Sequence, residues 1–224
     1  MQPYVFCRLP DGCGRPELGG DPGSLAHLPA AWQAVPAAPI GNYRWNEGRS
    51  GPKAQVQAAY DEEGLQLLFM AWEQPVRAEI REQGGMVYTD SCMEFFFQPF
   101  PEEDDRYFNI EVNPLGVMLI GLGVERAGRF EAAQPPLPGM RVTATVTDPA
   151  AYRAPVWAVA YTLPFSLIAS HFGRRRLGSG DVFRGNFYKC GEHTPRPHWG
   201  MYREVEASAP DFHRPEFFAP MALE

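Results

Sequence analysis

Apolar and polar residues alternate with a period of two along most of the chain beyond residue 52. Residues 53–60 show this alternation, and a second apolar run at 65–72 follows the short polar stretch 61–64. Side chains of a strand point alternately to its two faces, so a period of two is typical of a half-buried strand. The polar stretch supplies a turn, and residues 53–72 are therefore predicted to form a hairpin.

Two central segments carry one apolar face and one polar face. In residues 92–97, Phe95 and Phe97 alternate with positions that include Glu94, and residues 108–113 repeat the pattern with Asn109 and Glu111. One face is expected to pack in the core, and the other to present carboxylates and amides. The intervening residues 101–105 form an acidic turn.

The remaining pattern completes an all-β chain. Residues 1–52 are rich in Pro, Gly and Ala and predict an irregular N-terminal segment packed on the domain formed by residues 53–224. One helical stretch is expected, at residues 165–172. Strands and helices do not alternate, which favours a two-sheet antiparallel β-sandwich of jelly-roll type. Five further strands are predicted, at 117–122, 142–147, 156–163, 183–190 and 217–223.

Composition narrows the function classes. Lys and Arg number 20 against 27 Asp and Glu, giving a net charge of −7, so no nucleic-acid partner is expected. The longest apolar stretch, residues 117–122, is far shorter than the roughly 20 residues of a membrane helix, so a soluble protein is expected. The N-terminus has no basic start followed by an apolar core, which predicts a cytoplasmic location unless a signal has been removed.

Two segments have some metal-binding character. Cys190, His193 and His198 follow a C-x2-H-x4-H spacing, but a fourth ligand is missing and two prolines interrupt the segment, which favours an ordinary loop. The acidic turn at 102–105 offers hard oxygen ligands for calcium without the spacing of an EF-hand. No cofactor is predicted, with structural calcium as the open alternative.

The polar face of the central strands admits two chemistries. Glu94 and Glu111 stand on segments expected to be neighbours, and such a carboxylate pair is what glycoside hydrolysis uses. Catalysis also needs one carboxyl kept protonated by an apolar pocket, whereas the neighbouring Asn109 and Asn113 indicate a polar floor. The chain contains no G-x-S-x-G, H-E-x-x-H or Walker-type glycine motif, so we favour binding over catalysis.

A saccharide fits these residue types. A pyranose ring has apolar C–H faces that stack on aromatic rings, and its hydroxyls hydrogen-bond to amides and carboxylates. The polar candidates are Glu94, Asn109, Glu111, Asn113 and Asn186, and the aromatic candidates are Tyr88, Trp199, Tyr202 and Phe212.

Five segments, in this order, resemble one known family. They are Tyr88-Thr-Asp-Ser-Cys-Met-Glu-Phe-Phe-Phe, Arg106-Tyr-Phe-Asn-Ile-Glu-Val-Asn-Pro, Trp157-Ala-Val-Ala-Tyr-Thr-Leu-Pro-Phe, Arg184-Gly-Asn-Phe-Tyr-Lys-Cys, and Pro210-Asp-Phe-His-Arg-Pro-Glu-Phe-Phe. Together they are similar to the family 9 carbohydrate-binding modules, in particular the family 9-like branch, from about residue 50 to the end of the chain. The resemblance implies a DOMON-like β-sandwich that binds the reducing end of a glycan between two aromatic rings without catalysis. Xylanase-associated members of that family carry structural calcium.

The resemblance also assigns roles to individual residues. Tyr88 and Phe212 fall where the family has its two sandwiching rings, both usually Trp. Asn109 falls where the family has a basic residue, and Arg106 is the nearest residue that supplies a cation instead. Glu94 would then accept hydrogen bonds from vicinal hydroxyls, with Asn109 and Asn186 as donors.

Three other functions stay open on the sequence alone. The DOMON-like superfamily includes haem-binding electron-transfer domains, for which Met86 or Met93 and His213 or Lys189 are the candidate ligands. A glycan-active enzyme using Glu94 and Glu111 is the second, and a structural or interaction role is the third. The predicted partner is a saccharide.

Overall fold

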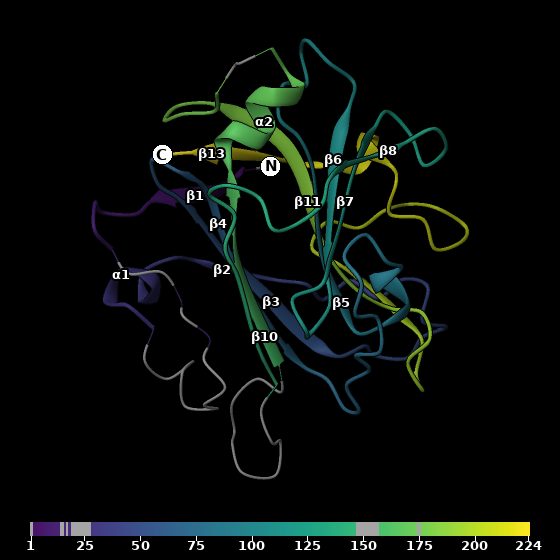
Figure 1. Ribbon diagram of the computed structural model, residues 1–224. Coiled ribbons are helices and arrows are strands. Elements are labelled where there is room, and N and C mark those ends of the chain that lie inside the picture. Colours follow the sequence, from purple (N-terminus) through teal and green to yellow (C-terminus); the bar gives the residue numbers. More distant parts are fainter. Residues whose placement is uncertain (1, 14–15, 17, 19–27, 147–156, 174–175) are drawn as a thin grey trace.

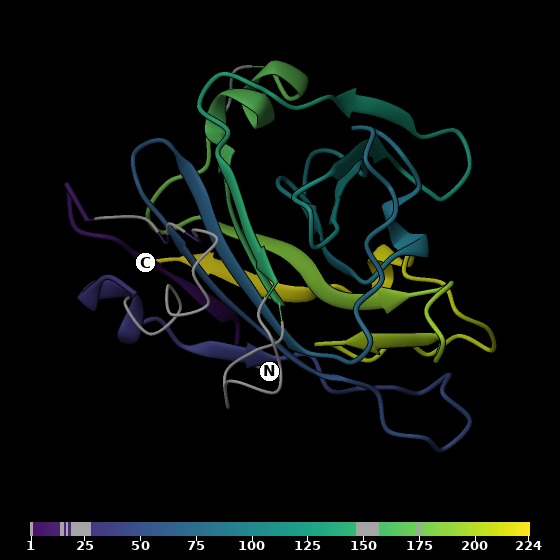
Figure 2. The same ribbon diagram turned by 60° about the horizontal axis from the view of Figure 1, so that its bottom comes forward.

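The fold is a single curled β-sheet whose two halves face each other (Figures 1 and 2). The computed structural model describes residues 2–13, 16, 18, 28–146, 157–173 and 176–224. In this part of the chain the strand order is β8-β7-β6-β5-β11-β13-β1-β3-β4-β10-β9, with β12 added beside β11 and β2 beside β3.

The first half of the sheet holds the central two-faced segments. It consists of β5 (Cys92–Gln98), β6 (Tyr107–Val112), β7 (Met118–Gly123), β8 (Phe130–Ala133), β11 (Val182–Gly191), β12 (His198–Met201) and β13 (Ala219–Leu223).

The second half holds the predicted hairpin. It consists of β2 (Ala37–Pro39), β3 (Lys53–Tyr60), β4 (Gly64–Trp72), β9 (Val142–Val146) and β10 (Trp157–Pro164). The short helices are α1 (Ala30–Gln33), α2 (Phe165–His171) and the 3-10 helices η2 (Val87–Thr89) and η3 (Pro215–Phe217).

Strand β1 (Tyr4–Arg8) joins the halves. It pairs in parallel with β13 on one side, Tyr4 opposite Met221, and in parallel with β3 on the other, Cys7 opposite Ala59. All other described strand pairs are antiparallel.

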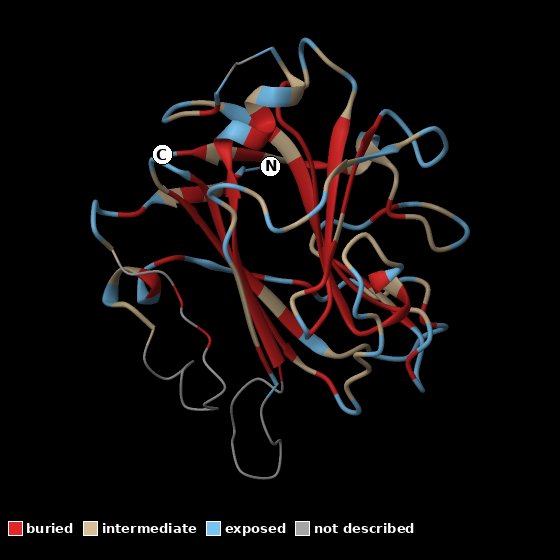
Figure 3. Cartoon of the chain, in the orientation of Figure 1, coloured by how far each residue is buried: buried red, intermediate tan, exposed pale blue. Residues whose placement is uncertain are grey.

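The core lies between the two halves and explains the alternation. Phe95 and Phe187 point into it from the first half, where their rings stack at 5.0 Å, and Phe69 of the second half meets Phe187 edge-on. The strands are buried almost throughout, whereas exposure is confined mainly to loops (Figure 3). The opposite face of β5, β6 and β11 forms a second apolar cluster that includes Phe96, Tyr188 and Phe212.

The predicted fold class is confirmed, and each predicted strand is present. Some predicted residues lie outside the described part of the chain. They are residue 147 at the end of one predicted strand, residue 156 at the start of the next, and part of the N-terminal segment, including residues 19–27. Strands β1, β2, β8 and β12 and helix α1 were not predicted. β1 (Tyr4–Arg8) is short and has no polar residue before Arg8, so it shows no polar alternation, although Tyr4 and Phe6 are buried and Val5 and Cys7 are partly exposed. No helix among the described residues has the length and apolar character needed to cross a membrane.

Candidate functional site

A pocket of about 130 Å³ opens on the face of β5, β6 and β11 that points away from the core. It brings together residues that are distant in sequence because three neighbouring strands form its floor and loops form its walls. Its lining is Tyr88, Glu94, Glu111, Leu119, Arg126, Arg129, Cys190, Glu192, Trp199, Pro210, Asp211, Phe212 and His213.

Two carboxyl groups face each other on the floor. Glu94 of β5 lies directly opposite Glu111 of β6, and both are almost fully buried. Like charges in such cross-strand positions repel. Burial, reinforced by Glu111, raises the pKa of Glu94 well above its usual value. Burial also raises the pKa of Glu111 to about 7. Both shifts arise because the strands exclude water from the carboxyls, and they occur even though the amide of Asn109 lies beside Glu111.

The two oxygens of Glu111 have different surroundings. Asn109 donates a hydrogen bond from Nδ2 to Oε1 of Glu111 at 2.9 Å, which favours the ionised form. Oε2 of Glu111 is buried and has no hydrogen-bond partner. A buried oxygen without a partner costs free energy, so this atom is poised to accept a hydrogen bond or bind a cation.

Two thiols lie next to these carboxyl groups, and only that of Cys190 lines the pocket. Cys92 shares the face of Glu94 two residues away, and Cys190 of β11 lies directly opposite Cys92. Sγ of Cys92 and carboxylate oxygens of Glu94 and Glu111 all lie within 4.8 Å of one another. Burial raises the pKa of both thiols, so both are neutral in the absence of a ligand.

Aromatic side chains form the walls. Tyr88 and Trp199 are half-buried, and the indole nitrogen of Trp199 has no hydrogen-bond partner. Phe212 is 7% exposed and stacks on Tyr188, with ring centroids 4.0 Å apart and an interplanar angle of 12°. One face of Phe212 is therefore already covered by protein.

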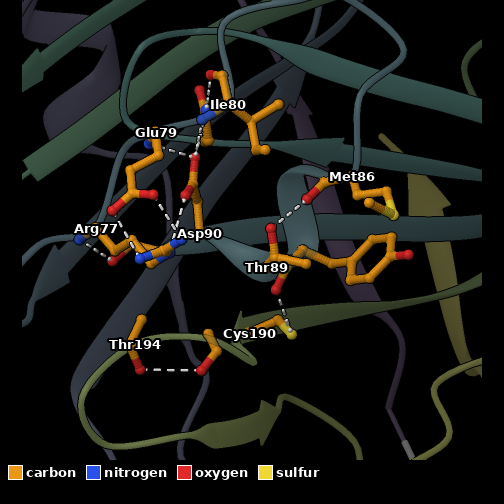
Figure 4. Close-up of polar contacts among 12 residues, drawn as sticks. Arg77, Glu79, Ile80, Met86, Thr89, Asp90, Cys190 and Thr194 are labelled. Carbon is orange, nitrogen blue, oxygen red and sulfur yellow. Dashed lines mark hydrogen bonds and ion pairs between the residues drawn. The ribbon is translucent and has the colours of Figure 1, made fainter.

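The loop before β5 is held by the buried carboxylate of Asp90. Its Oδ2 accepts hydrogen bonds at 2.9 Å from the backbone N–H groups of Glu79 and Ile80 (Figure 4). The hydroxyl of Thr89 donates to the carbonyl of Met86 at 2.8 Å, closing the turn that carries Tyr88. These contacts fix Tyr88 at the pocket, six residues ahead of Glu94.

Charged residues at the rim were missed by the sequence analysis. Arg126 and Arg129 follow β7, and Asp211 and His213 precede η3. Arg126 lies 3.8 Å from Asp211, and Arg129 contacts His213. Burial and Arg129 lower the pKa of His213 to about 2, so its ring is neutral and accepts from Arg129. The only sequence signal was their position in turns, because their convergence depends on the strand order.

Two predicted residues lie elsewhere. Arg106 lines a separate surface pocket, where its guanidinium binds both carboxylate oxygens of Asp104 and the carbonyl of His171. Arg106 therefore does not supply the missing cation, and the nearest guanidinium groups belong to the rim. Asn186 is buried on β11 and holds the backbone of Arg203, donating to its carbonyl at 2.8 Å and accepting from its N–H.

Several residues of the alternative ligand sets have other partners in the structure. His198 faces the opposite side of the sheet from Cys190, where its Nε2 lies 2.8 Å from Lys189 Nζ, so the C-x2-H-x4-H residues do not converge. In the acidic turn, both oxygens of Asp104 accept from Arg106 rather than standing free for calcium. Of the candidate haem ligands, Met93 points into the core and Lys189 is paired with Glu73.

Sequence comparison decides the family. The profile of carbohydrate-binding family 9 matches residues 27–223, nearly the whole chain. The chain belongs to carbohydrate-binding family 9. Among the curated proteins, no sequence matches this family 9 chain.

Solved structures share the fold over the full length. A candidate carbohydrate-binding protein from Bacteroides uniformis has 26% identity and a TM-score of 0.75, with 98% of this chain and 97% of that chain covered. A family 9 module from Caldicellulosiruptor kristjanssonii in complex with glucose has 13% identity and a TM-score of 0.65, covering 100% and 96%. The same kind of module in complex with cellotriose has 11% identity and a TM-score of 0.64, covering 100% and 94%. Like these proteins, this family 9 chain is a carbohydrate-binding β-sandwich.

Proposed function

We propose that the pocket on β5, β6 and β11 binds the end of a saccharide without cleaving it. The observation that carries the proposal is the convergence of Tyr88, Glu94, Glu111, Trp199 and Phe212 on one pocket from four distant segments. The complexes of the Caldicellulosiruptor modules with glucose and cellotriose support a sugar as the ligand.

The floor and walls suit the two kinds of surface that a pyranose presents. Glu94 and Glu111 offer carboxylate oxygens to vicinal hydroxyls, and Asn109 holds Glu111 in place for this role. Tyr88 and Trp199 retain exposed ring surface for stacking on C–H faces. Phe212 backs this wall from its stack on Tyr188.

The family favours binding over hydrolysis. In a glycosidase the two carboxyl groups flank the scissile bond, one acting as acid and the other as nucleophile or base. Glu94 and Glu111 stand side by side on the same face of one sheet, where they can hold two hydroxyls of one sugar. The matching family is one of carbohydrate-binding modules, and two modules of similar fold are complexes with sugars, so we take binding as the role of this pair.

Isothermal titration calorimetry tests the proposal. The ligands are glucose, cellotriose, xylobiose and the corresponding borohydride-reduced alditols. We expect saturable binding of at least one sugar, weakened up to about tenfold in Glu94→Gln, because the amide cannot reproduce the hydrogen bonds of the carboxyl and a lost hydrogen bond costs roughly 0.5–1.5 kcal/mol. Tyr88→Ala is expected to weaken binding several-fold through the lost stacking.

Arg106→Gln provides the matched control because Arg106 lies at a different pocket. Its affinity should equal that of the wild type. An unchanged affinity in both Glu94→Gln and Tyr88→Ala would place the sugar elsewhere, and turnover of an aryl glycoside that is abolished in Glu94→Gln would establish catalysis instead.

A further inference from the structure

We infer that the pocket floor is a binding site for a thiophilic divalent cation of the zinc type, with Cys92, Glu94 and Glu111 as ligands. Among the described residues, these three form the one group of His, Cys, Asp or Glu side chains whose ligand atoms lie within 4.8 Å of one another. All three are buried. The inference concerns the protein without sugar and goes beyond saccharide binding.

The strand register builds this arrangement. Cys92 and Glu94 are two residues apart on β5 and share one face, and Glu111 lies opposite Glu94 on β6. The three side chains therefore stand as a triangle on two hydrogen-bonded strands. Cys190, opposite Cys92 on β11, places a second thiol beside the triangle.

A second observation points to a missing ligand. Oε2 of Glu111 is buried without any hydrogen-bond partner, although Asn109 holds the other oxygen of the same carboxyl. In the part of the chain that the structure describes, no Lys, Arg or His lies within ion-pairing distance of Glu94 or Glu111. The rim arginines are engaged with Asp211 and His213. Burial raises the pKa of Glu111, and Arg129 and Arg126 oppose this from a distance without contacting it, so the positive charge in direct contact with the two carboxyls would come from the cation.

The donor set selects the kind of metal. Calcium takes six to eight oxygen ligands, and magnesium prefers oxygen and water, whereas a thiolate with two carboxylates suits zinc and its chemical relatives. Three protein ligands leave one tetrahedral position. Because Glu94 and Glu111 line the pocket and Cys92 does not, that position faces the pocket, where water or a sugar hydroxyl can occupy it.

The ligand atoms lie near, but not at, the spacing of a bound metal. Bond lengths of about 2.3 Å to sulfur and about 2.0 Å to oxygen place tetrahedral ligand atoms roughly 3.5 Å apart. The three ligand atoms lie within 4.8 Å of one another, so metal binding would draw them closer together.

Cobalt(II) serves as the spectroscopic probe. Reduced protein, dialysed against a chelator, is titrated with Co²⁺ and then with Zn²⁺ in competition. We expect one equivalent to bind with a sulfur-to-cobalt charge-transfer band, displacement by zinc, and no comparable binding of Ca²⁺. The band should vanish in Cys92→Ser and persist in Cys7→Ser, whose thiol lies on β1 away from the pocket.

Glu111→Gln keeps the thiol and removes one anionic ligand with little change of shape. We expect it to retain the band but to bind Co²⁺ more than about tenfold more weakly. A protein that binds no Co²⁺ saturably, or a band that survives in Cys92→Ser, would overturn the inference. Circular dichroism of each variant confirms that it is folded.

Sugar titrations with and without zinc separate this inference from the proposed function. Zinc binding without sugar binding contradicts only the proposed function, and sugar binding without any metal binding contradicts only the metal site. Tighter sugar binding in the presence of zinc would indicate that a hydroxyl takes the fourth position.

Discussion

Two buried polar clusters lie on opposite faces of the half-sheet that contains β5, β6 and β11. They differ in whether a cation contacts the buried carboxyl groups. On the core side, the closed cluster joins Glu73 to Lys189 at 3.0 Å, to the indole N–H of Trp157 at 2.9 Å and to His198 at 3.5 Å. On the pocket side, the floor sets Glu94 against Glu111 without a cation in contact.

The presence or absence of a contacting cation distinguishes a buried charge that stabilises the fold from buried carboxyls that are available to a ligand. Lys189 is fully buried, yet it contacts Glu73, His198 Nε2 at 2.8 Å and the carbonyl of Cys190 at 2.7 Å. Burying a charge is tolerable only when such partners replace water. Among the described residues, no cationic side chain contacts the floor, and there burial raises the pKa of Glu94 and Glu111 instead, with the amide of Asn109 as a partner of Glu111.

The largest effect is expected from breaking the closed cluster. Lys189→Met removes the cation and leaves Glu73 as an unpaired buried carboxylate. Loss of one partner of a buried ion pair costs about 3–5 kcal/mol. Urea unfolding monitored by tryptophan fluorescence measures this change in the free energy of unfolding.

The double variant Glu73→Gln, Lys189→Met is the control. It removes both charges at once and should recover much of the lost stability, because no unpaired charge remains. A double variant no more stable than Lys189→Met would show that packing, rather than charge pairing, holds this cluster together.

The closed cluster should also make stability depend on pH. Burial, followed by the neighbouring Lys189, lowers the pKa of His198 from 6.5 to about 4. Between these values the unfolded state binds a proton that the folded state does not, so stability falls as pH drops from about 6.5 to about 4. The contribution is about 3 kcal/mol at most.

Urea unfolding at several pH values tests this in the wild type and in His198→Asn. His213, whose pKa is lowered to about 2, contributes a slope of the same sign, so the difference between the two proteins isolates His198. Identical pH profiles would rule His198 out as the titrating group.

At the floor, neutralising a charge should cost little stability. Burial already raises the pKa of Glu111 and of the facing Glu94, so Glu111→Gln replaces a partly neutral carboxyl with an amide of the same shape. The free energy of unfolding should therefore change by less than about 1 kcal/mol. Saccharide affinity should fall about tenfold in the same protein. A destabilisation as large as that of Lys189→Met would mean that the floor is structural too.

The smallest effect is expected at the pocket wall. Tyr88→Phe removes a hydroxyl from a half-buried side chain and keeps the ring that stacks. Stability should stay within about 0.5 kcal/mol of the wild type, and sugar affinity within about twofold. Calorimetry that shows a much larger loss of affinity would assign the hydroxyl a direct hydrogen bond to the ligand.

Much of the fold and the floor of the site followed from alternation alone. The period of two placed Glu94 and Glu111 on one face and Phe95 and Ile110 on the other, as observed. Local patterns carry this information because a strand exposes its two faces in strict turn. The pairing of β5 with β6 then set the two carboxyls opposite each other.

Features that depend on the order of strands could not be predicted in this way. Arg106 was placed near Asn109 by sequence proximity, but it precedes β6 and turns to Asp104 and away from the pocket. Arg126 and Arg129 reach the rim from a turn with no pattern of its own. Lys189 stands among apolar residues, and nothing in the sequence indicates that Glu73 is its partner.

Strand β1 pairs in parallel with both β13 and β3, and this pairing has a consequence for folding during synthesis. Tyr4 leaves the ribosome 217 residues ahead of its partner Met221, since 221 − 4 = 217. The hairpins β3–β4 and β5–β6 can therefore form early, but β1 can pair with β13 only after β13 has been synthesised. Contacts so distant in sequence slow folding. During synthesis, the edge of β1 that pairs with β13 therefore stays unpaired while the strands of the pocket already form.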